Sequence, residues 1–156
     1  MHNNPLHTEP RAARFGEIKV VRRGPVNGAL SGLISMAFPK SKQRRLVVDE
    51  LPYIACVSEN GRTQDGGVKL RVIAQAEYGC ESLCVISGMV NRDYWLDFPN
   101  IDLENTFAIT PRVICELIRY SLNNGWSPTK SKTQVLIEID NDQLFAIMRQ
   151  VGIVRP

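Results

Sequence analysis

The residues best suited to chemistry lie in an acidic and aromatic segment around position 95. Asp93 and Asp97 flank Trp95, and paired carboxylates can act as acid and base where their surroundings separate their pKa values. On a strand, these three residues share one face. Tryptophan and tyrosine are also enriched at the centres of protein interfaces. Three interpretations stay open: a protein-binding surface, a histidine-independent enzyme using Asp93 and Asp97, or a Trp95 packed under a loop or helix. The protein-binding surface would comprise Tyr94, Trp95 and Asp97.

A second group of charged residues is basic and lies in the first third of the chain. Residues 1–49 contain nine Lys or Arg and three Asp or Glu, a balance of +6, whereas residues 50–156 carry −3. Such cations could neutralise phosphates, and binding would then weaken steeply with salt. The run contains no aromatic side chain for base stacking and no recognisable DNA-binding helix. Nucleic-acid binding is therefore the alternative to a solvated loop between strands. Its contact residues would be Arg22, Arg23, Lys40, Lys42, Arg44 and Arg45.

Other kinds of catalytic or cofactor site have little support. Both histidines, His2 and His7, lie in a polar N-terminal stretch that cannot hold a base against a nucleophile. Cys80 and Cys84 lack the second close pair that structural zinc prefers, so we interpret them as a turn cysteine and a strand cysteine. The chain has no glycine-rich phosphate loop. We expect no catalytic residue, metal or cofactor, and lean against an enzyme.

The clearest element is a helix within residues 109–126. Thr110 is a good N-cap, Pro111 suits the first helical position, and Gly125 suits the position after the C-cap. Between them a helical stripe is apolar apart from its last member, which predicts a helix with one buried face. The stripe consists of Ile114, Leu117, Ile118 and Ser121.

The same segment resembles a pattern in small uncharacterised bacterial proteins. It is also similar to parts of small immunity-type proteins encoded near toxins or on mobile elements. The shared pattern is ITPxxIxxLIxYxLxNGWxP, about 20 residues of the 156. Every matching position also has a structural role, as cap, core stripe or closing tryptophan. The resemblance therefore implies a shared helix and a bacterial, mobile-element context, and it assigns no catalytic residue.

The remaining patterns predict strands before this helix and one strand and one helix after it. Residues 133–139 alternate as a strand does, and Asp140 with Gln143 forms a capping-box pattern before a final helix. Earlier β-rich runs occupy residues 16–23, 53–58, 68–75, 83–90 and 94–98, and residues 28–38 fit either a strand or a helix, with their alternation favouring a strand. This order predicts an α+β fold, an antiparallel sheet covered on one face by two C-terminal helices. We expect residues 1–14 to form a flexible tail and residues 15–156 a single domain.

Composition limits the class of protein. The chain has 156 residues, of which 44% are hydrophobic and 22% charged, unlike a disordered chain. Its longest apolar run, Leu144–Met148, is far shorter than the roughly 20 residues of a membrane span. The first ten residues contain no apolar signal region. We therefore expect a cytoplasmic protein with reduced cysteines. Our leading hypothesis is a non-enzymatic module that binds an unknown protein partner.

Overall fold

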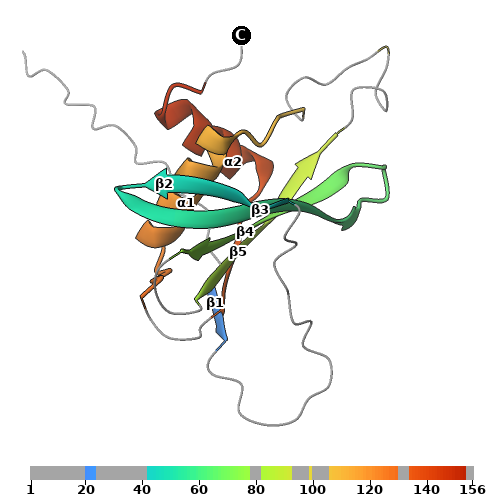
Figure 1. Ribbon diagram of the computed structural model, residues 1–156. Coiled ribbons are helices and arrows are strands. Elements are labelled where there is room, and N and C mark those ends of the chain that lie inside the picture. Colours follow the sequence, from blue (N-terminus) through green and yellow to red (C-terminus); the bar gives the residue numbers. More distant parts are fainter. Residues whose placement is uncertain are drawn as a thin grey trace, which may run out of the picture.

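A six-stranded sheet and two helices form the framework of the molecule (Figure 1). The computed structural model describes residues 42–77, 82–92, 99, 106–129 and 134–153, together with the backbone of residues 20–23. The elements are β1 (Val20–Arg23), β2 (Arg44–Val48), β3 (Leu51–Arg62), β4 (Val68–Ala76), β5 (Leu83–Asn91), α1 (Pro111–Asn123), β6 (Gln134–Glu138) and α2 (Asn141–Gln150).

Helix α1 begins and ends where its sequence predicts. The Thr110 hydroxyl accepts a hydrogen bond from the Val113 amide at 3.3 Å, and Pro111 occupies the first turn. At the other end, Gly125 adopts a φ of 94°, the left-handed conformation that glycine tolerates best. The Trp126 amide then bonds the Ser121 carbonyl at 3.0 Å. The helix turns one apolar stripe toward the sheet, and every residue of the predicted stripe is buried.

Helix α2 is fixed at its start by two side chains. Asp140 and Gln143 form the predicted capping box, with the Gln143 amide donating to the Asp140 carboxylate at 2.8 Å. The Asn141 side chain reaches strand β5, where it accepts from the Val90 amide at 2.9 Å and donates to the Val90 carbonyl at 2.8 Å. These bonds attach the first turn of α2 to the sheet.

The strands follow the order β1-β6-β5-β4-β3-β2. All neighbouring pairs are antiparallel except β5 and β6, which are parallel. A parallel pair requires a long crossover, and α1 lies within that connection. The sheet is thus mostly antiparallel, and β1 and β2 are its edges among the described strands.

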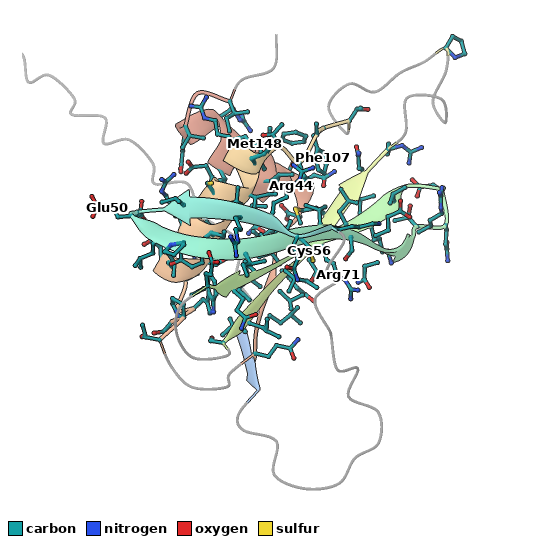
Figure 2. The ribbon with its side chains drawn as sticks, viewed as in Figure 1. Arg44, Glu50, Cys56, Arg71, Phe107 and Met148 are labelled. Atoms are coloured by element: carbon teal, nitrogen blue, oxygen red, sulfur yellow. The ribbon has the colours of Figure 1, made fainter. Side chains whose placement is uncertain are left out.

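Both helices cover the same face of the sheet, which confirms the predicted α+β fold. One core cluster joins the helical stripes to alternate strand residues, among them Tyr53, Val72, Ile86 and Ile137. A smaller cluster lies on the opposite face of the sheet, because its residues alternate along the strands with those of the main core. It consists of Cys56, Ile73 and Val85. In Figure 2, Met148 and Phe107 lie on the helix side, and Cys56 and Arg71 lie on the other side.

The structure departs from expectation at two places along the chain. Residues 44–48 form a strand, whereas the basic run favoured a loop. Strand β3 continues through Arg62, so the turn that follows it is shorter than expected. A hydrogen bond from the Thr63 amide to the Gly67 carbonyl, 2.8 Å long, closes this turn. The tail at 1–14 and the strands predicted at 28–38 and 94–98 lie outside the described residues. No described helix is long and apolar enough to cross a membrane.

Candidate functional site

The structure describes only part of the candidate site residues. Tyr94, Trp95 and Asp97 lie outside the described residues, as do Asp93 and Lys40. The protein-binding and carboxylate hypotheses based on this segment therefore remain predictions.

The basic residues are divided between the two edges of the sheet. Arg22 and Arg23 belong to β1, whereas Arg44 and Arg45 belong to β2 at the other edge, with Lys42 just before it. Neighbouring strands lie about 4.8 Å apart, so the two groups are separated by about 24 Å. The fold does not bring them together into one patch.

Strand β2 ends in a tight hairpin that is attached to α1. Asp49 and Glu50 connect β2 to β3, and both have positive φ angles, 49° and 67°. Two such residues define a type I′ turn, which normally contains Asn and Gly because other residues are strained there. The Asp49 carboxylate accepts a hydrogen bond from the Arg119 guanidinium of α1 at 2.9 Å, which raises the Arg119 pKa. Figure 2 shows Glu50 at the outer end of the hairpin.

Among the described strands, only β3 pairs with β2, so the other side of β2 is a free edge within the described sheet. The Pro52 carbonyl accepts from the Glu77 amide at 2.9 Å and so points toward β4. Pro52 and its β2 partner Val47 are therefore a pair that exchanges no hydrogen bond. It follows that the N–H and C=O groups of Val47 point outward, and by alternation so do those of Arg45.

The exposed apolar side chains lie at the same hairpin. Val47 is 67% exposed and Leu51 is 54% exposed, the large hydrophobic side chains that the described part of the chain leaves open. Val47 lies on the sheet face opposite the helices, because its neighbours Leu46 and Val48 pack into the helix-side core. Leu51 pairs with Val48, so it lies on the helix side, and the two exposed side chains do not form one patch. The unpaired backbone of an edge strand, beside an exposed valine, is typical of a surface that other chains bind.

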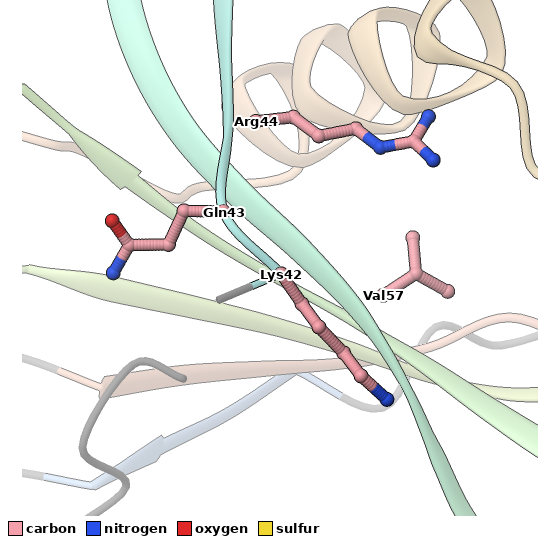
Figure 3. Close-up of a pocket in the computed structure, with 4 residues that line it drawn as sticks. All are labelled: Lys42, Gln43, Arg44 and Val57. Atoms are coloured by element: carbon pink, nitrogen blue, oxygen red, sulfur yellow. The ribbon is translucent and has the colours of Figure 1, made fainter. Parts of the chain in front are cut away.

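The cations around β2 have different surroundings. Arg45 forms an ion pair with Glu77 at 2.9 Å. Lys42 and Arg44 are exposed, and no ion pair joins either to another described residue. Together with Gln43 and Val57, they line an open depression of about 310 Å³ (Figure 3). This depression suits an anionic side chain or a phosphate better than a reaction, since neither an acid nor a thiol belongs to its lining.

The described cysteines are unsuited to nucleophilic work. Cys56 and Cys84 are buried, whereas Cys115 is only partly buried. Burial raises the pKa of Cys84 to about 12, and it also raises the pKa values of Cys56 and Cys115. A thiol must lose its proton to attack, so the raised pKa values disfavour the reactive thiolate form at neutral pH. Within the described ranges, no three His, Cys, Asp or Glu side chains are placed to hold a metal ion.

Comparison with known proteins found no family model, no curated protein and no solved structure that matches this chain. The site must therefore be interpreted from its own geometry.

Sequence reasoning missed the edge of β2 as a candidate surface. The residues Val47 and Leu51 belong to the run RRLVVDELPY, whose alternation is compatible with a hairpin. The usual Asn-Gly turn signal is absent, because Asp49 and Glu50 occupy the turn. Only the strand order identifies β2 as an edge.

Proposed function

We propose that this protein is a non-enzymatic, cytoplasmic binding module of bacterial origin that acts through contact with another protein chain, as an immunity-like or accessory factor. The observation that carries the proposal is the edge of β2, where exposed Val47 lies beside backbone groups that no other described strand pairs. An extended segment can add to such an edge as a new strand, with backbone hydrogen bonds supplying affinity. The function is thus recognition by strand addition.

Specificity would come from the side chains along this edge. Arg45 and Val47 lie on one face of β2, and Arg44 lies on the other. An added strand would place successive side chains alternately against these two faces. The depression at Lys42, Arg44 and Val57 would then accept one anionic side chain of the added segment.

A position-specific cross-linking experiment tests this function. A photo-reactive amino acid replaces Val47 in the full chain, and a matched control carries it at the exposed Asp142 of α2. After irradiation in host cells, we expect a discrete protein adduct from position 47 and none from position 142. The absence of an adduct at 47, or adducts of equal yield at both positions, would contradict strand addition at β2.

The acidic and aromatic segment is proposed as a second contact. Replacing Trp95 by Ala is expected to weaken partner binding about tenfold or more, as loss of an interface tryptophan does. The melting temperature should change little if Trp95 is a contact residue. A fall of several degrees would instead mark Trp95 as part of the core.

Nucleic-acid binding is the second candidate, and one observation favours it. Lys42 and Arg44 are exposed cations on one depression, without an acidic partner among the described residues. These groups could contact phosphates, although the division of the basic residues between opposite edges limits the number that one duplex could reach. The carboxylate enzyme, which uses Asp93 and Asp97, remains a third hypothesis based on the sequence.

A further inference from the structure

We propose that the strand added to β2 comes from a second copy of this protein, paired antiparallel across a twofold axis at Leu46. The inference rests on the proposed function, since it names the partner of the same edge. The axis would run perpendicular to the sheet, so that the helices of both copies cover the same face. The two sheets would join into one.

The first argument is the charge pattern along the strand. Lys42, Arg44 and Arg45 lie at its start, and the acidic turn Asp49-Glu50 lies at its end. Antiparallel pairing places the basic end of each copy beside the acidic end of the other, whereas parallel pairing places like charges together. With the axis at Leu46, Lys42, which precedes β2, comes beside the turn that contains Glu50 of the second copy. Both side chains are exposed, and neither has an ion pair with a described residue.

The second argument is the direction of the backbone groups. The outward groups of β2 belong to Arg45 and Val47, while Leu46 turns its own groups toward β3. Across an axis at Leu46, Arg45 of each copy comes opposite Val47 of the other. Those residues are then a hydrogen-bonded pair on each side of the axis, and every outward N–H and C=O between them is satisfied.

The third argument concerns the exposed apolar surface. Val47 is 67% exposed in the single chain. In the dimer its side chain packs against the aliphatic part of Arg45 from the second copy, on the same face of the joined sheet. Burial of this side chain adds a hydrophobic contribution to the backbone hydrogen bonds.

Other registers satisfy fewer of these conditions. A shift of one residue along the pair would match the helix face of one copy with the open face of the other. Moving the axis to Arg45 sets the two Arg45 side chains directly opposite each other, and like charges in that position are destabilising. Moving it to Val47 shortens the paired region, because each strand turns away at Asp49.

Sedimentation equilibrium of the full chain tests the dimer, over concentrations from about 1 to about 200 µM. We expect the wild-type protein to dimerise, and to do so less tightly at high salt. Lys42→Glu and Glu50→Lys should each weaken dimerisation about tenfold, since two attractive pairs become repulsive. The double variant Lys42→Glu/Glu50→Lys restores both attractions and should restore the dimer. The control Lys69→Glu makes the same charge change on interior strand β4 and should have no effect.

A backbone variant tests the hydrogen bonds directly. Val47→Pro removes an N–H that points outward, so it should abolish the dimer while the pairing of β2 with β3 and the melting temperature remain. A protein that stays monomeric throughout the concentration range overturns the inference. A dimer unaffected by Lys42→Glu and Val47→Pro also overturns it. In either case, a cross-link between position 47 and a different protein would still support the proposed function. The absence of any cross-link at position 47 would contradict both the dimer and the proposed function.

Discussion

At the scale of single residues, the aromatic pair under helix α1 shows how burial constrains polar atoms. The rings of Tyr53 and Trp126 lie 5.8 Å apart at a tilt of 53°. The Trp126 indole N–H donates to the Ser82 hydroxyl at 3.1 Å, so its polar atom is satisfied. The buried Tyr53 hydroxyl has no hydrogen-bond partner among the described residues. An unpaired buried hydroxyl is destabilising, and burial raises the Tyr53 pKa.

Replacing Tyr53 by Phe is therefore expected to be neutral or to stabilise the protein by about 1 kcal/mol at pH 7. The raised pKa adds a pH dependence. Above pH 10 the unfolded tyrosine loses its proton while the folded one retains it, so the wild-type protein loses stability as pH rises. The Phe variant lacks this loss. Urea unfolding at pH 7 and at about pH 10.5, just above the ordinary tyrosine pKa, measures the change in stability and its pH dependence. If the Phe variant were less stable than the wild type, the Tyr53 hydroxyl would have a hydrogen-bond partner.

At the scale of elements, a bulge in β5 decides how β6 and α2 meet the sheet. The β4–β5 register shifts between Leu70 and Val72, opposite Ser87 and Gly88. Gly88 has a φ of 101°, and the Ile139 amide donates to the Ser87 carbonyl at 2.8 Å. A Cβ at position 88 would lie 2.7 Å from the Ile139 carbonyl oxygen. Glycine thus permits the close approach of the chain that leads into α2.

Replacing Gly88 by Ala should destabilise the fold by about 3 kcal/mol, because it combines an unfavourable φ with a clash against backbone. Gly61 provides a matched control, since its φ is 96° and a methyl group added there would have nothing within 4 Å. Gly61→Ala should cost only about 1 kcal/mol. Chemical denaturation of both variants separates the effect of the clash from the φ penalty. Equal losses in the free energy of unfolding would argue against a close approach at Gly88.

At the scale of the whole molecule, charge is distributed across the sheet rather than concentrated. The strand order places β1 and β2 at opposite edges, so the basic residues of these two described strands are divided between the edges. Around β2, the described cations from the first third of the chain are Lys42, Arg44 and Arg45. Such a small group is better suited to ion pairs with another protein chain than to wrapping a duplex.

We accordingly expect no duplex DNA or RNA binding that depends on this group at physiological salt. The measurement compares the wild-type chain with Arg44→Ala/Arg45→Ala over a salt series, by fluorescence anisotropy. If the two arginines contact phosphates, the double variant should bind all sequences more weakly and lower the salt slope by about two. That result would favour the nucleic-acid candidate over strand addition.

Much of the fold was determined by the sequence itself. Thr110, Pro111 and Gly125 delimit α1, and Asp140 with Gln143 begins α2, because caps act on the adjacent backbone. Alternation in β3 to β6 likewise distinguishes the two faces of the sheet, since one face must be buried. These signals are local, so they can be interpreted without knowing which strands pair.

Only the tertiary structure decided the candidate surface. Strand order depends on contacts between residues far apart in the chain, and no local pattern shows that β2 is an edge or that β5 and β6 are parallel. The same order separates Arg22 and Arg23 from Arg44 and Arg45, which are near one another in sequence. Val47 is exposed because β2 has a neighbour on one side only among the described strands. Pairing between distant strands, rather than residue type, therefore determines which backbone is open to a partner.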